Sequence, residues 1–167
     1  VMMDIEVPSI ASYFSDDILP VGGLMITHGW AKSFKSFTMF DLLSMAAQCE
    51  PWCGFMPLEE PVPVAVVQFE IKWAYYRQRI AHLRDHAPNR ELFDQNFLTW
   101  TPLTRPKLRA GDTKSEDNML TVLDEAGVQI VLFDPIRRMA GEADLNAENE
   151  MRKMLGFFER LNDNGIT

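Results

Sequence analysis

The sequence has no long hydrophobic run. None of its apolar stretches approaches the roughly 18 residues that a membrane-spanning helix requires. Its first residues, Val1-Met-Met-Asp-Ile-Glu, contain no basic segment followed by an apolar one, as a secretory signal would. We therefore expect a cytoplasmic protein with no membrane partner.

Cysteine is also scarce. Cys49 and Cys53 are the two cysteines of the chain, and His82 and His86 form a pair at i, i+4 spacing. Neither pair supplies the number of ligands that a structural zinc site requires. The sequence therefore favours reduced thiols and an ordinary histidine pair over a zinc site.

Positive charge is in deficit. The chain has 16 Lys and Arg against 24 Asp and Glu, a net charge of −8. This balance argues against a strong stand-alone nucleic-acid surface, because neutralising phosphates needs clustered basic residues. A few basic residues that line a channel in an assembly remain compatible with this balance. The length of 167 residues and the hydrophobic content of 47% indicate one folded domain.

What the sequence does contain is an alternation of short apolar runs and helical periodicity. Runs of strand length predict strands at residues 24–27, 63–69, 96–100 and 128–134. Apolar residues at helical spacing predict helices that begin near Phe37, Trp73, Met119 and Met151. The remaining polar or turn-rich stretches indicate loops at residues 1–22, 101–115 and 141–146. The alternation predicts an α/β fold, a mostly parallel sheet flanked by helices.

A stretch of phosphate-binding type joins the first predicted strand to the first predicted helix. Gly29, Lys35 and Ser36 keep the spacing of G-x-x-x-x-G-K-[ST]. In that motif backbone N–H groups cradle phosphates, the lysine reaches them and the hydroxyl holds Mg²⁺. The motif has glycine where this chain has Phe34, and a positive φ there would cost about 1–3 kcal/mol. The alternative is an ordinary strand-to-helix turn with an exposed lysine.

Acidic residues follow two of the other predicted strands. Glu70 comes directly after residues 63–69, and Asp134 ends residues 128–134. In parallel sheets ligands bind outside the carboxyl ends of the strands. We therefore expect Lys35, Ser36, Glu70 and Asp134 to share one cleft. Taken singly, either acid could instead cap a following helix.

These motifs resemble the RecA-type hexameric ATPases, and within them the RepA-like replicative helicases and their phage and mobile-element relatives. Residues 19–36 are similar to the approach to the Walker A motif and to the motif itself. Residues 64–70 resemble the strand that ends in the catalytic glutamate, and residues 130–141 are similar to the Walker B strand with its following loop. The resemblance covers nearly the whole chain and implies a single RecA-like P-loop NTPase domain over residues 1–167.

The resemblance also implies a function. It implies ATP binding and hydrolysis with Mg²⁺, as the motor of a DNA helicase or related replication protein. Such a motor works as a homo-oligomeric ring, expected to be a hexamer, with single-stranded DNA as a partner.

Site residues follow from the same resemblance. Lys35 and Glu70 would be catalytic, and Ser36 and Asp134 would hold the metal ion. The nucleotide-binding loop would comprise Gly29, Trp30, Ala31, Lys32, Ser33, Phe34, Lys35, Ser36 and Phe37. Three arginines are candidates for contacts to the base or the phosphates: Arg77, Arg79 and Arg137.

One strand of the RecA-like arrangement has no full counterpart. It follows the last helix and inserts between the P-loop and Walker B strands, so we expect Ile166 and Thr167 to begin it and the domain to be incomplete. The arginine finger and the DNA loops would lie beyond Thr167. With Phe34, this leaves open a non-hydrolysing nucleotide-binding or assembly module on the same fold. A small-molecule kinase is disfavoured by Glu70 and by the absence of a recognisable lid.

Overall fold

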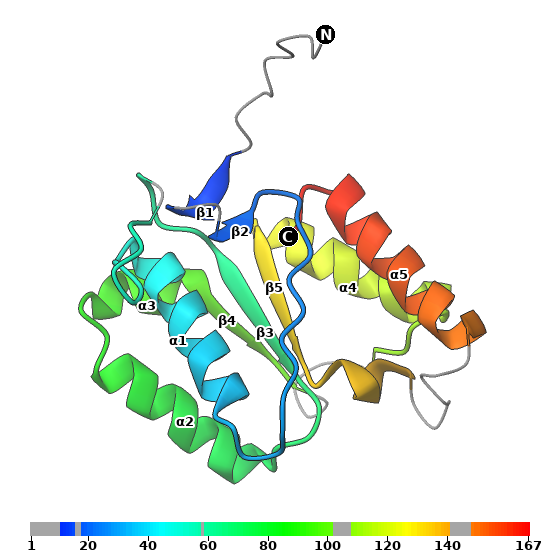
Figure 1. The fold of residues 1–167 in the computed structure, drawn as a ribbon, viewed down its shortest axis with the longest axis horizontal. Coiled ribbons are helices and arrows are strands. Elements are labelled where there is room, and N and C mark those ends of the chain that lie inside the picture. The colour runs from blue at the N-terminus through cyan, green and yellow to red at the C-terminus, as the bar shows by residue number, and fades with distance from the viewer. Residues whose placement is uncertain (1–10, 16–17, 58, 102–107, 141–147) are drawn as a thin grey trace, which may run out of the picture.

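The computed structural model describes residues 11–15, 18–57, 59–101, 108–140 and 148–167, and it has the predicted α/β layering (Figure 1). The parallel sheet has three strands in the order β4–β3–β5, namely β4 (Phe97–Trp100), β3 (Val64–Gln68) and β5 (Ile130–Asp134). The strands predicted at residues 63–69, 96–100 and 128–134 are thus confirmed. No helix in the described ranges is both long and apolar enough to cross a membrane.

β3 is the middle strand because its side chains are apolar on both faces. Val64 and Val66 belong to one core, and Ala65 and Val67 belong to the other. All five residues of β3 are buried. A continuous apolar run is what a strand covered by helices on both sides requires.

The first core lies under α1 (Lys35–Gln48), α2 (Trp73–Asp85) and a short helix α3 (Arg90–Asn96) (Figure 1). The apolar spacing that predicts the first helix marks its buried face, since Phe40, Leu43 and Ala47 are each no more than 3% exposed. The apolar stripe is therefore what seats α1 on the sheet.

Periodicity does not predict α3, because the helix is only seven residues long. Its start depends instead on a cap, in which the Asn89 side chain accepts a hydrogen bond from the Leu92 N–H at 3.1 Å. The Asn89 N–H donates in turn to Oε1 of Gln48 at 2.8 Å. The buried Gln48 side chain thus fixes the chain path between α2 and α3.

The second core lies under α4 (Thr113–Glu125) and α5 (Glu148–Asp163) on the opposite face (Figure 1). The structure corrects the loop expected through residue 115, since α4 begins at Thr113. Its first turn is polar, so apolar periodicity starts too late to reveal it. Residues 102–107 and 141–147 lie outside the described residues, and they include part of the loop expected at residues 101–115 and all of the loop expected at residues 141–146. Arg160 of α5 ties the helices together through ion pairs with Glu116, at 2.7 Å between Nη1 and Oε2, and with Asp117.

The N-terminal segment also differs from the expected loop. β1 (Ser12–Phe14) and β2 (Ile18–Pro20) form an antiparallel pair. Tyr13 and Phe14 are buried in the first core, at 2% and 1% exposure. Strands of three residues are too short for an alternating pattern to appear in the sequence.

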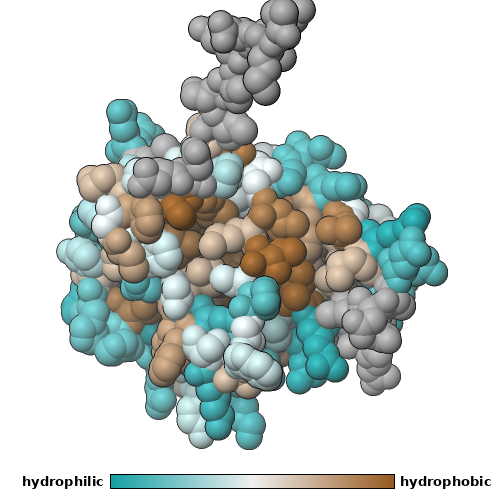
Figure 2. Space-filling model, viewed as in Figure 1, coloured by the Kyte–Doolittle hydropathy of each residue, from teal (hydrophilic) through white to brown (hydrophobic). Residues whose placement is uncertain are grey.

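The structure contradicts the strand predicted at residues 24–27. No backbone hydrogen bond is formed by this segment within the described part of the chain. Its apolar side chains are also largely exposed, since Leu24, Met25 and Ile26 are 51%, 44% and 63% exposed. Apolar side chains gather at the centre of this face of the molecule (Figure 2). The segment has a strand's composition without a neighbouring strand to pair with.

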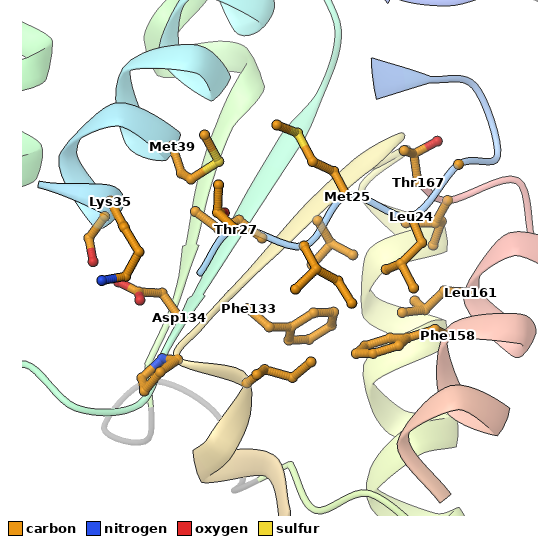
Figure 3. Close-up of a pocket in the computed structure, with 18 of the residues that line it drawn as sticks. Leu24, Met25, Thr27, Lys35, Met39, Phe133, Asp134, Phe158, Leu161 and Thr167 are labelled. Atoms are coloured by element: carbon orange, nitrogen blue, oxygen red, sulfur yellow. The ribbon is translucent and has the colours of Figure 1, made fainter. Parts of the chain in front are cut away.

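An apolar groove of about 190 Å³ lies between this segment and β5 (Figure 3). Leu24 and Met25 line it from the segment, Phe133 from β5, and Phe158 and Leu161 from α5 (Figure 3). The groove separates the backbone of residues 24–27 from that of β5, so the two segments do not pair.

Thr167 lies at one end of the groove and pairs with β5 as a parallel strand would. Its N–H donates to the Gln129 carbonyl and its carbonyl accepts from the Val131 N–H, both at 2.8 Å. Its hydroxyl accepts from the Gly22 N–H, also at 2.8 Å. These bonds place Thr167 between the start of β5 and Gly22.

Candidate active site

A cavity of about 380 Å³ lies at the carboxyl edge of the sheet. Its lining consists of Lys32, Ser33, Phe34, Lys35, Ser36, Phe37, Gln68, Glu70, Ile71, Arg79 and Asp134. The four residues that we expect to share a cleft are all in this set. Parallel pairing brings them together, because Gln68 in β3 is the register partner of Asp134 in β5.

The phosphate-binding stretch forms a tight turn that leads directly into α1. Phe34 occupies the position before the helix with φ 62° and ψ 11°, in the left-handed region, and Lys32 has φ 64°. The glycine position of the motif therefore does have the backbone that favours glycine. The Phe34 side chain is 72% exposed, so burial offsets little of its backbone strain.

The Lys35 ammonium closes this loop on itself. Nζ donates to the carbonyls of Gly29 and Trp30, at 2.9 and 2.8 Å, and to the Ser33 hydroxyl at 3.2 Å. These acceptors are uncharged, whereas hydrogen bonds to an anionic oxygen are stronger. A phosphate that entered the loop would therefore compete well for this ammonium group.

Asp134 lies across from Lys35, and the two side chains extend toward the same point (Figure 3). Burial raises the pKa of the Asp134 carboxyl, and a hydrogen bond from Ser36 lowers it. The charge of Glu70 raises this pKa further, while Arg79 and Lys35 lower it. The carboxylate is thus only partly compensated by its neighbours.

The expected loop residues are not equally placed. Residues 32–37 line the cavity, whereas Gly29, Trp30 and Ala31 do not. Gly29 and Trp30 take part through their carbonyls, and the Trp30 side chain is 90% exposed.

One of the three expected arginines belongs to the cavity. Arg79 lines it, and its guanidinium lies 4.4 Å from the centre of the Phe37 ring in a cation–π contact. Arg77 and Arg137 are exposed and outside the lining. Glu70, just beyond β3, is exposed at the rim, where a water molecule has access.

Sequence reasoning missed Gln68. This side chain is 1% exposed and lines the cavity. Its Oε1 accepts from the Ile71 N–H at 2.9 Å. The available signal was a polar residue at the last position of an otherwise apolar buried strand.

The donor set fits a nucleoside triphosphate with Mg²⁺. Lys35, Arg79 and the N-terminus of α1 provide positive charge and dipole for phosphates. The Ser36 hydroxyl and the Asp134 carboxylate suit Mg²⁺. This ion is usually bound by only a few protein oxygens together with oxygens of the substrate phosphates. Among the described residues no cluster of three or more His, Cys, Asp or Glu could hold a metal ion.

A family model described as an AAA domain matches residues 4–166. The chain belongs to the AAA domain family. No curated protein matches it. This AAA domain is of the P-loop NTPase class that occurs in RecA-like proteins, so the interpretation of the sequence as a P-loop ATPase is confirmed.

The strain at Phe34 gives the first prediction. Phe34→Gly should be about 1 kcal/mol more stable than Phe34→Ala, since both remove the ring but only glycine relieves the left-handed backbone. Urea unfolding of the two variants measures the difference. Trp30, whose φ is not positive, provides the control, because Trp30→Gly should be no more stable than Trp30→Ala. Equal stability of the two position-34 variants would show that the left-handed backbone costs nothing there.

The buried carboxyl of Asp134 gives the second. Folding raises the pKa of this carboxyl, so the protonated group stabilises the fold at pH values below its ordinary pKa of 3.8. This stability is lost as the pH rises through the pKa of the folded state. Asp134→Asn has no carboxyl to ionise, so it does not lose this stability as the pH rises. Its melting temperature should therefore exceed that of the unaltered chain at about pH 7. The two should converge below the ordinary value.

Thermal unfolding across this pH range tests the expectation. Asp124→Asn on the exposed surface of α4 is the control for the amide exchange itself. A lower melting temperature for Asp134→Asn at neutral pH would mean that the carboxylate stabilises the ligand-free chain.

Proposed function

We propose that this AAA domain hydrolyses ATP in the cavity at the carboxyl edge of the sheet. The observation that carries the proposal is that Lys35, Ser36, Glu70 and Asp134 line one cavity although they come from three separate segments. A cation, a hydroxyl and two carboxylates are the groups that phosphoryl transfer to water uses.

Each group has a distinct task in the reaction. Lys35 leaves the loop carbonyls and binds oxygens of the β and γ phosphates. Glu70 orients a water molecule and accepts its proton as the water oxygen bonds to the γ phosphorus. The bond from this phosphorus to the bridging oxygen breaks, ADP leaves with the electron pair, and the proton passes from Glu70 to solvent.

Ser36 and Asp134 are the residues that would hold Mg²⁺. When bound, the ion neutralises charge that develops on the phosphate oxygens. Both side chains line the same cavity, so one ion could reach the hydroxyl and the carboxylate. Arg79, fixed over Phe37, adds positive charge at the rim.

We further propose that the domain is the motor of a DNA helicase or a related replication protein. Its resemblance to the RepA-like replicative helicases supports this, as does its membership of the P-loop NTPase class of RecA-like proteins. The working form would be a homo-oligomeric ring in the cytoplasm, expected to be a hexamer. The net charge of −8 favours DNA contacts confined to a channel rather than spread over the surface.

A second candidate is a non-hydrolysing nucleotide-binding or assembly module. Two observations favour it: the strain at Phe34 and the engagement of Lys35 by the loop carbonyls. The bonds from Lys35 to these carbonyls must break before the ammonium group can bind phosphates. Phe34 also stands where the motif has a glycine, which lets the backbone approach a ligand closely. Measured ATP turnover separates the two candidates.

Substitution of Lys35 and Glu70 tests the division of roles. Lys35→Ala should weaken ATP binding by about tenfold or more, since it removes a charged hydrogen-bond donor. Glu70→Gln should keep ATP affinity and reduce turnover by roughly 10²–10⁴-fold, as expected for a lost general base. Calorimetric binding and phosphate release measure the two effects.

Controls for these charges are available on exposed helix positions. Lys114→Ala and Glu125→Gln on α4 should leave both measurements unchanged. If both site variants lost ATP binding to the same extent, the separate roles would be wrong.

The helicase proposal predicts coupling to nucleic acid. ATP turnover should rise when single-stranded DNA is added, and the rise should shrink at high salt because phosphate contacts release counterions. The assay compares phosphate release with single-stranded DNA, double-stranded DNA and no DNA. Turnover that is unaffected by DNA would leave an ATPase and remove the helicase role.

A further inference from the structure

The Gln68 carboxamide is held in one orientation. It ends β3, is 1% exposed, and its Oε1 accepts from the Ile71 N–H at 2.9 Å. A backbone N–H can only donate, so the oxygen and not the nitrogen must face Ile71. The amide nitrogen therefore lies on the other side of the group.

This nitrogen has no partner. Among the described residues Nε2 of Gln68 is buried and makes no hydrogen bond. A buried donor left unpaired costs about 1–3 kcal/mol, so a native structure seldom keeps one without a purpose. The other fully buried glutamine, Gln48, shows the usual arrangement, since its Nε2 donates to the carbonyl and hydroxyl of Ser44 at 2.8 and 3.1 Å.

The surroundings of Gln68 indicate which kind of acceptor would pair with this amide N–H. It lines the cavity together with Lys35, Ser36 and Arg79, all of which suit anionic oxygens. Its register partner is Asp134, at the end of the neighbouring strand. It also lies two residues before Glu70 and holds the backbone just after Glu70 through Ile71.

We propose that Nε2 of Gln68 donates a hydrogen bond to an oxygen of the terminal phosphate of ATP. This inference rests on the proposed function, because it requires that the cavity binds ATP. ADP has no γ phosphate and would leave the donor unpaired, so Gln68 favours the triphosphate over the diphosphate. Through Oε1 the same amide links the phosphate to the turn that carries Glu70.

Nucleotide affinities measured without turnover test the assignment. The probes are ADP and a non-hydrolysable ATP analogue, each with Mg²⁺, added to the unaltered chain and to Gln68→Glu and Gln68→Met. Gln68→Glu keeps an acceptor for Ile71 and loses the amide donor, whereas Gln68→Met loses both. For each variant we expect affinity for the ATP analogue to fall about tenfold or more, and affinity for ADP to change by less than about twofold.

Gln48→Met is the matched control. It removes an equally buried amide whose hydrogen bonds lie within α1 and at Asn89, away from the cavity. It should lower stability and leave the ratio of the two affinities unchanged. A ratio that shifts in this control as well would assign the effect to lost packing.

A readout on the unaltered chain covers the case in which the position-68 variants do not fold. The side-chain amide signal of Gln68 in a ¹⁵N NMR spectrum should shift with the ATP analogue and not with ADP. An equal response to both nucleotides, or none to either when both bind, would overturn the proposal and leave Nε2 to a buried water. If the unaltered chain bound neither nucleotide, the proposed function itself would fail, and this inference with it.

Discussion

The parallel pairing of β3 with β5 is the constraint on which the site depends. Its register sets Gln68 opposite Asp134, so both strands end at one level. Shifting a strand by one residue turns each side chain to the other face. A slip of β5 would therefore turn Asp134 away from Ser36. A slip of β3 would exchange the residues that it contributes to the two cores. Packing and chemistry thus select the same register.

The groups that line the cavity are poorly suited to an empty site. Phe34 has a left-handed backbone, the Asp134 carboxyl has a raised pKa, and Gln68 has an unpaired buried donor. Each raises the free energy of the ligand-free fold, and none is needed to fill a core. Such local conflicts are expected where a sequence serves binding rather than folding. Magnesium and phosphate oxygens would satisfy the carboxylate and the donor together, which links ligand binding to stability.

The sequence predicts β3 and β5 because both have nearly continuous apolar runs of strand length, although only β3 is buried along its whole length. The sequence does not predict the elements whose formation depends on particular hydrogen bonds. Residues 24–27 have the composition of a strand, but within the described part of the chain no backbone hydrogen bonds hold them in a sheet. In α3 the reverse holds, since the Asn89 cap and the Gln48 side chain start a helix too short to show a period. Motif spacing predicts Lys35 and Ser36, whereas Gln68 belongs to no motif and becomes evident only from its burial.

The lack of sheet pairing at residues 24–27 also affects how the phosphate-binding loop is held. In a sheet, the strand before such a loop is fixed by bonds to its neighbours, and here that support is absent among the described residues. The loop is held instead from its helical side, where Lys35 of α1 reaches back to Gly29, Trp30 and Ser33. One ammonium group therefore both maintains the empty loop and suits the phosphate that would displace those bonds. Opening of the loop and binding of phosphate are then a single exchange of hydrogen bonds at Lys35.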